Sequence, residues 1–451
     1  MWLAVMAVAY RLASASTPTC GQPDLPPDPR CGDSLDGREA PPDPGSEAGR
    51  AALAVPHLVS QVVMWPVVET STFTEHHKIP QWLRAITTSD DGLVGIRPEF
   101  QYASGFAPSI GFHIFYKRLP GASEALVRFR TAGPDVIFTE ARLRVPFGLT
   151  LDGGWNRRRD RLFAGIGPQS RHDSTDIGHE IARYAADVGY GNLTWATPKH
   201  RLLQAEVGAG AEYRDYNSSD VRGGPSVAEL YGAPPASCAA LGLPEPCVDP
   251  LLVPGFDSNR RLVRQRGRIK LDVRRSGRDA SGLEIALDAN HVQGVFGDRT
   301  HHAGLSVETI LSLGGLDRAL ILRGVAAVVQ PLGSGFIPFD DLIMPTGASG
   351  MRGFPLGRFR DRSGIVATAE WRWLVTSSID ASLFTDAGTV AGSWFSGLGW
   401  QNVYPDFGVG LRLFRLKDPP YWNAEPHYGL QVAYAREPET NLRVLLSVAG
   451  F

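Results

Sequence analysis

The sequence contains no run of about 18 apolar residues, which is the length of a helix that crosses a lipid bilayer. That absence excludes helical membrane spans, but transmembrane β-strands alternate polar and apolar residues and leave hydropathy near neutral. An excess of one charge is also missing, because 45 basic and 47 acidic residues give a net charge of −2 in 451 residues. We therefore expect no nucleic-acid partner. Methionine is scarce, at 5 residues, whereas 50 glycines and 9% aromatic residues favour an all-β protein with many turns.

Cysteine is rare, with four residues in two local pairs. Cys20 and Cys31 lie in a proline-rich N-terminal region, and Cys238 and Cys247 lie in a stretch that we expect to be a long loop. Neither pair has the doublet spacing of a zinc site, so we expect no metal. Two local pairs are typical of disulfides in an oxidising compartment, with unpaired loop thiols as the alternative.

The sequence contains no motif of a serine hydrolase, a phosphate-binding loop or a zinc protease in a context that would support such a site. His76-His77 has no third ligand near it, which disfavours metal binding. His301 and His302 follow Asp298 in GDRTHHAG, and a surface turn explains them better than a catalytic site at a barrel rim. We expect no enzyme, no catalytic residue and no cofactor.

The N-terminal part of the chain divides into three segments. Residues 1–15 are apolar and end in Ala-Ser-Ala, which predicts an export signal; no basic residue precedes the apolar run, and a misplaced start site is the alternative. Residues 16–52 are rich in proline and aspartate, and we expect a disordered tether. Residues 53–92 have apolar groups at helical spacing interrupted by prolines, which fits either an interfacial element or an ordinary packing helix.

Beyond these segments, apolar and polar residues alternate with period two. Leu283, Ile285 and Leu287 share one face of a strand, whereas Glu284 and Asp288 share the other. About sixteen such segments follow one another, an even number typical of bacterial membrane barrels. We place them near 93–103, 108–118, 123–131, 135–146, 147–157, 179–192, 200–215, 258–274, 280–295, 302–314, 318–330, 363–375, 378–388, 403–415, 426–436 and 441–451.

The predicted connections differ in length on the two ends of these strands. Those after odd-numbered strands include the long stretches 158–178, 216–257 and 331–362, as in outer-membrane barrels with long loops outside the cell. Five basic residues share one face of the strand over 262–274, which suits a water-filled lumen. The exposed face of a soluble β-sandwich or propeller is the alternative. We predict an all-β, 16-stranded antiparallel transmembrane barrel over 93–451, in contact with outer-membrane lipid.

The last long loop contains the triplet Arg352-Gly353-Phe354, and two predicted strands follow it. Alternation places Glu370 and Asp386 on the polar faces of these strands. The planar guanidinium can bind two carboxylates, the glycine lets the loop turn tightly, and the phenylalanine can anchor the loop against the wall. We therefore predict a loop that folds into the lumen and is held there by charge. A solvated arginine with incidental lumen acids is the alternative.

Together these residues resemble the barrel of the BamA/TamA-type superfamily, also called bacterial surface antigens. The triplet at 352–354 follows the eleventh strand, where the family places its lumen loop, and Glu370 lies on the next strand. Asp386 and Gly388 belong to FTDAG, which is similar to the family's Phe-x-Asp-x-Gly strand motif. Phe451 ends the chain as the closing-strand aromatic of such barrels does, although it is out of phase with the apolar face of its strand.

The resemblance implies a bacterial outer-membrane barrel that inserts or exports proteins or handles lipid. Its partners would be client outer-membrane or secreted proteins and separate periplasmic subunits. The first and last strands would form a seam that opens sideways, while the Arg352 loop stabilises the lumen. Residues 1–92 leave no room for an array of periplasmic polypeptide-transport-associated (POTRA) repeats, so we expect a member without them. A passive channel or structural surface barrel without assembly activity is the alternative.

Overall fold

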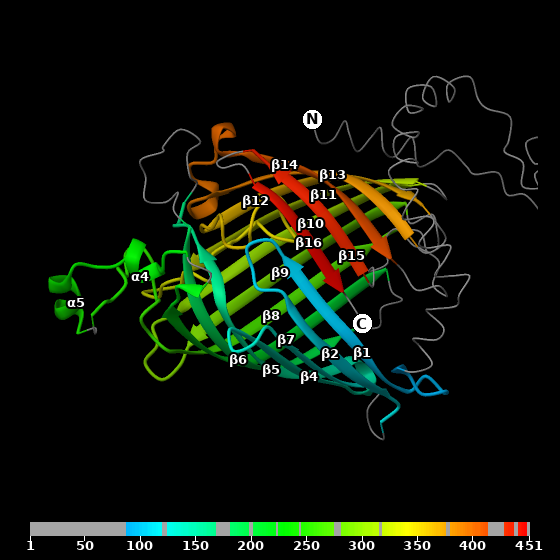
Figure 1. Cartoon of the computed structure of the whole chain (residues 1–451), viewed down its shortest axis with the longest axis horizontal. Coiled ribbons are helices and arrows are strands. Elements are labelled where there is room, and N and C mark those ends of the chain that lie inside the picture. Colours follow the sequence, from blue (N-terminus) through cyan, green and yellow to red (C-terminus); the bar gives the residue numbers. More distant parts are fainter. Residues whose placement is uncertain are drawn as a thin grey trace, which may run out of the picture. The chain divides into compact units, whose positions relative to one another are not determined.

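Sixteen antiparallel β-strands close into a barrel in this computed structural model. The strands follow one another in chain order, and the first strand pairs with the last. Figure 1 shows the first and last strands side by side, with β1 in blue next to β16 in red. The structure describes residues 87–119, 124–167, 181–197, 202–221, 224–242, 245–274, 281–314, 318–375, 379–413, 428–436 and 441–448.

The strand bounds agree closely with the alternating pattern of the sequence. The strands are β1 (Val94–Ala103), β2 (Ser109–Lys117), β3 (Glu124–Thr131), β4 (Val136–Arg144), β5 (Leu149–Phe163), β6 (Ala182–Ala196), β7 (Leu203–Ser218), β8 (Arg260–Asp272), β9 (Gly282–Gly294), β10 (His301–Gly314), β11 (Arg318–Pro331), β12 (Ser363–Leu374), β13 (Ile379–Ala391), β14 (Tyr404–Leu413), β15 (Tyr428–Ala435) and β16 (Asn441–Val448). The predicted fold class, a 16-stranded antiparallel barrel rather than a soluble sandwich, is confirmed.

The end of β5 differs most from the sequence prediction, which stopped this strand at residue 157. The strand continues to Phe163. Residues 157–161 are Arg-Arg-Arg-Asp-Arg, and the register with β6 shifts between Arg158 and Arg161. A bulge inserts an extra residue and moves the following side chains to the opposite face. A strict period-two pattern of polar and apolar residues therefore does not predict the part of the strand beyond the bulge.

Alternation separates an outward apolar face from an inward polar face. On β8, Ile269 and Leu271 are exposed on the outside. Arg264, Arg268 and Lys270 alternate with them and lie close to carboxylates inside the barrel. Apolar side chains that cover the outside of a closed barrel are suited to lipid, whereas paired charges are suited to a polar lumen.

The two rims of the barrel differ in the lengths of their connections. One rim, here called the long-loop rim, carries the connections 164–181, 219–259 and 332–362. The second of these contains the short helices α4 (Val227–Leu230) and α5 (Pro235–Leu241). Single 3-10 turns lie at η3 (Pro146–Gly148), η6 (Ser393–Phe395) and η7 (Trp400–Asn402). None of the described helices is long and apolar enough to span a membrane.

The connection 332–362, here called the lumen loop, crosses the inside of the barrel. At one side, Arg360 donates to the carbonyl of Leu162 in β5 at 3.0 Å. Nearby, Arg264 of β8 donates to the Asp341 carboxylate at 2.8 Å. At another side, Arg352 donates to carboxylates of β12 and β13. The loop is therefore bonded to widely separated parts of the wall.

A core of buried aromatic residues joins the lumen loop to the connection 219–259. Phe339 of the lumen loop packs edge-on against Phe163 of β5 and Tyr216 of β7, with ring centroids 5.6 and 5.0 Å away. Phe256 of the connection 219–259 lies 5.8 Å from the same ring. Burial of these rings fixes both loops to one side of the wall.

Candidate functional site

Arg352 of the lumen loop lies at the centre of a buried charge cluster. Its Nε and Nη2 donate to the two oxygens of Asp386 at 2.8 and 3.0 Å, and its Nη1 donates to Glu370 Oε2 at 3.0 Å. The guanidinium also lies 3.4 Å from the centroid of the Phe384 ring. All three charged residues are at most 5% exposed. The arginine thus satisfies both carboxylates with one rigid fork, which a lysine could not do.

The triplet's other two residues let the loop approach the wall closely. The Gly353 amide donates to Asp406 Oδ2 at 2.9 Å, and a Cβ at this position would lie 2.6 Å from the Asp406 Cβ. A glycine is therefore needed here because a larger side chain would not fit, and not because of backbone conformation, since its φ is outside the left-handed region. Phe354 is fully buried in a cluster with Met351. A Cβ at Gly388 would lie 2.9 Å from the Met351 sulfur, so both glycines make room for the loop.

A second anchor holds the lumen loop to β7 and β8. The Asp341 carboxylate accepts from Arg264 at 2.8 Å and from Arg214 at 3.1 Å. Asp340 accepts from Arg214 and from the hydroxyl of Tyr216. Burial opposes the ionisation of Asp341, but the nearby arginines outweigh burial and hold the pKa of Asp341 below its usual value. The carboxylate therefore stays charged and paired at neutral pH.

The seam between β1 and β16 is the shortest strand pairing in the described barrel. Residues 101–103 of β1 align with 445–447 of β16, whereas β10 aligns with β11 over 302–314. Beyond the aligned pairs, the Val444 amide donates to Ser104 Oγ at 2.8 Å, and the Ser104 amide donates to the Val444 carbonyl at 3.0 Å. Within the described residues, which end at Val448, no partner on β16 aligns with residues 94–100.

Comparison with solved structures identifies the fold. The barrel is similar to BamA from Haemophilus ducreyi lacking POTRA domains 1–3, with a TM-score of 0.51 and 13% sequence identity over 79% of this chain and 70% of that chain. The chain has the fold of the BamA barrel. No family model and no curated protein sequence matches it.

Two further structures show a weaker likeness. CdiB from Acinetobacter baumannii has a TM-score of 0.44 at 12% identity, and CdiB from Escherichia coli has 0.45 at 10% identity. These matches cover 80% and 78% of this chain, which spans 63% and 62% of the CdiB chains. The chain therefore matches less than two thirds of either CdiB.

Two residues of this BamA-type barrel that the sequence analysis missed also hold the lumen loop. Asp406 of β14 lies opposite Asp386 in the strand register and accepts the Gly353 amide. Arg443 of β16 donates through Nη1 to the carbonyl of Arg352 at 3.1 Å and to the carbonyl of Phe354. Alternation would have placed Asp406 in the lumen. Nothing in the pattern of the sequence, however, indicates that Arg443 bonds main-chain carbonyls of a distant loop.

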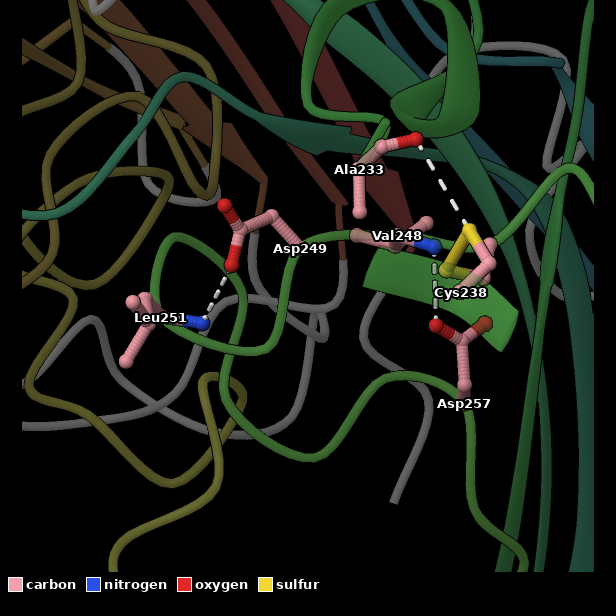
Figure 2. The surroundings of a disulfide bond; sticks show 7 residues. Ala233, Cys238, Val248, Asp249, Leu251 and Asp257 are labelled. Atoms are coloured by element: carbon pink, nitrogen blue, oxygen red, sulfur yellow. Dashed lines mark hydrogen bonds between the residues drawn. A yellow bond between two sulfur atoms is a disulfide. The ribbon is translucent and has the colours of Figure 1, made fainter. Parts of the chain in front are cut away.

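Cys238 and Cys247 form a disulfide in the connection 219–259 (Figure 2). Their Cα atoms are 5.8 Å apart, and both side chains are buried. Figure 2 also shows the Asp257 carboxylate, which accepts the Val248 amide at 2.8 Å. The bond and the carboxylate close this loop on itself at the long-loop rim of the BamA-type barrel.

The prediction that His301 and His302 lie on a surface turn is wrong. Both residues belong to β10, because His301 aligns with Gln293 and His302 with Val292 of β9. The His301 amide and carbonyl also bond to Phe336 and Leu332 of the lumen loop. His302 is buried, with its Nε2 3.4 Å from Asp341 Oδ2. Three other residues from the sequence analysis and one pair, namely Cys20, Cys31, Phe451 and His76-His77, lie outside the described residues.

Proposed function

We propose that this barrel assembles other proteins in the bacterial outer membrane or exports them across it, and that it does so by opening sideways between β1 and β16. The observation that carries the proposal is the seam, which aligns residues 101–103 with 445–447 in the described structure. An incoming strand needs backbone N–H and C=O groups that are not already paired. When a closed barrel opens, separating its shortest strand pairing frees such groups at the lowest free-energy cost, because the fewest hydrogen bonds are broken.

The lumen loop supports the proposal because it holds the rest of the wall together. Ion pairs link this loop to β7 and β8 on one side and to β12 and β13 on the other. A barrel that loses one strand pairing keeps these bonds. The wall can therefore stay folded while the seam is open.

The proposal implies partners of three kinds. Outer-membrane lipid would cover the apolar outer face, client proteins would contact the seam, and separate periplasmic subunits would deliver the clients. The chain shares its fold with a BamA chain whose name refers to POTRA domains. This likeness supports partners of these kinds and identifies no particular partner. No catalytic residue or cofactor is part of the proposed activity.

Conductance distinguishes the proposal from a passive channel. Because the lumen loop crosses the interior, we expect the reconstituted barrel to conduct weakly and in short, irregular openings. A steady, wide-open current in planar bilayers would favour a channel role instead.

The direct test is depletion of the protein followed by quantitative proteomics of the isolated outer membrane and of the culture medium. We expect a fall in other barrels or in secreted proteins, broad or selective, before growth stops. If only this protein is lost from the outer membrane and the secreted proteins in the medium are unchanged, the assembly and export role is ruled out.

A further inference from the structure

The outward face of β9 and β10 changes character toward the long-loop rim. His302 of β10 lies inside the barrel beside Asp341, so alternation places its neighbour His301 on the outside. On β9, the exposed Leu287 marks the outer face, and His291 lies four residues farther along that face. Two imidazoles therefore lie on the outside of the wall, past the apolar positions that suit lipid. Rings at such a place need a partner, because an unpaired polar group beside hydrocarbon costs free energy.

The two rings meet through the same atom of each. The Nε2 atoms of His291 and His301 are 3.2 Å apart, and the ring centroids are 5.3 Å apart with an angle of 76° between the planes. A hydrogen bond between these atoms would use one proton and one lone pair. Two lone pairs directed at one ion fit the same distance, because an ion about 2.0–2.1 Å from both nitrogens would be bound at an angle of about 100°, close to tetrahedral.

Two glutamines extend the pair into a set of four side chains. β8, β9 and β10 lie side by side (Figure 1), and their register places Gln265 of β8 opposite His291 and Gln293 of β9 opposite His301. Residues opposite each other project from the same face of a sheet, and both glutamines are exposed. Each amide offers an uncharged oxygen. A hydrogen bond between the rings needs no further donors around it, whereas an ion needs donors of this kind.

The donor atoms select the class of ion. Imidazole nitrogen is suited to zinc, copper and nickel, whereas calcium and magnesium require mainly carboxylate and carbonyl oxygens. Within the described residues, no group of three or more His, Cys, Asp and Glu side chains could hold a metal. The set therefore has the donors of a two-histidine site completed by amide oxygens, and it lacks the carboxylates of a calcium site.

The backbones of both histidines are firmly held. His291 and His301 belong to strands that align over residues 282–293 and 301–312. The amide and carbonyl of His301 also bond to Phe336 and Leu332, and a Cβ at Gly335 would lie 2.5 Å from the Cβ of His301. The beginning of the lumen loop thus rests on His301. An ion held by both rings would cross-link β9 to β10 beside the beginning of this loop, on rigid elements that favour a defined geometry.

We propose that His291 and His301 bind a zinc ion on the outside of the barrel, with Gln265 and Gln293 as further oxygen donors, and that the ion cross-links β9 to β10. The lone pairs of the two Nε2 atoms form the bonds to zinc, and each neutral imidazole keeps its proton on Nδ1. The site is independent of the seam and of the proposed function.

Zinc titration of the full chain in lipid nanodiscs, followed by calorimetry, tests the assignment. His291→Phe and His301→Phe each keep an aromatic ring and remove both nitrogens. Each should weaken zinc binding by about tenfold or more, since loss of an outer-shell partner alone costs about 10–100-fold. Arg299→Gln is the control, because Arg299 is an exposed residue of the connection between β9 and β10 and its guanidinium offers zinc no lone pair. Its affinity should equal that of the parent.

Zinc-edge X-ray absorption of the parent, with one ion per chain, gives a second readout that needs no variant. We expect two imidazole ligands, with the rest of the shell at about 2.0–2.2 Å. Zinc should also slow hydrogen exchange in β9, β10 and residues 332–336 of the parent and in neither Phe variant. Equal affinity in the parent and both Phe variants, or a zinc shell without two imidazoles, would overturn the proposal. If the Phe variants fail to fold, the absorption spectrum still decides.

Discussion

The seam and the wall at β12–β14 are made of the same kind of strand, yet they are held together differently. β12 and β13 align over residues 363–374 and 380–391 and share a buried arginine with two carboxylates. Within the described residues, the seam aligns over three residues and is completed by Ser104. The lumen loop therefore strengthens the wall, and within the described residues it is bonded to the β16 side of the seam through Arg443. Local stability can differ across one sheet in this way without any break in the sheet itself.

The largest expected effect is that of Arg352→Ala. This change leaves Asp386 and Glu370 buried without their shared cation, which typically costs about 3–5 kcal/mol. We expect a lower yield of folded barrel and a lumen loop that proteases cut readily. Urea unfolding in lipid, followed by heat-modifiable mobility on gels, measures the change.

Arg144→Ala provides the matched control for Arg352→Ala. Arg144 pairs with Glu124 at 3.0 Å, but its side chain is 47% exposed. An exposed pair contributes about 0–1 kcal/mol, so this variant should unfold like the parent. Equal unfolding midpoints for the two variants would contradict the role given to the lumen cluster.

Loss of the disulfide should have the next largest effect, confined to one loop. The double variant C238S/C247S removes a bond that closes a 9-residue separation, worth about 2–3 kcal/mol to the connection that it closes. Limited proteolysis with mass spectrometry should show faster cleavage within 219–259, whereas barrel mobility on gels should stay the same. A barrel that unfolds as a whole would show that this loop, too, supports the wall.

Gly353→Ala tests the close approach of the lumen loop to β14. The added methyl group would lie 2.6 Å from the Asp406 Cβ, and such overpacking costs about 1–3 kcal/mol. Gly324→Ala is the control, because a Cβ at Gly324 meets nothing within 4 Å. Hydrogen exchange should rise in the lumen loop of the first variant alone. Similar exchange in both variants would mean that the loop tolerates displacement from β14.

The smallest effect on stability should come from Ser104→Ala, at about 1 kcal/mol for one lost hydrogen bond. Thr139→Val is the counterpart in the wall, since Thr139 Oγ1 accepts the Trp155 amide of the neighbouring strand at 3.2 Å and donates to its carbonyl at 3.3 Å, as Ser104 Oγ does with Val444. Both variants should unfold at nearly the same urea concentration. Only Ser104→Ala should speed the reaction of a cysteine at Leu446 with a thiol reagent. Equal rates in the two variants would mean that the seam is no weaker than the wall.

The strands could be predicted from the sequence because each exposes one apolar face, as Leu283, Ile285 and Leu287 of β9 do. The Arg352 cluster could be predicted as well, because alternation puts Glu370 and Asp386 on the lumen side of their strands. What could not be predicted are contacts between distant segments that follow no period. The bulge at Arg158 hid the end of β5, and the bonds from Arg443 to loop carbonyls depend on where the loop lies, which no local pattern encodes.

The claim that the seam must open is tested most directly by locking it. A disulfide between Tyr102→Cys and Leu446→Cys, which are aligned partners, would join β1 to β16. The control disulfide joins Val307→Cys to Ala326→Cys, the aligned partners on β10 and β11. Both variants are expressed in depleted cells, and the outer-membrane proteome is measured with and without reductant. We predict that the seam lock fails to restore the proteome until reductant is added, while the control lock restores it throughout. A seam lock that restores the proteome without reductant would contradict the account.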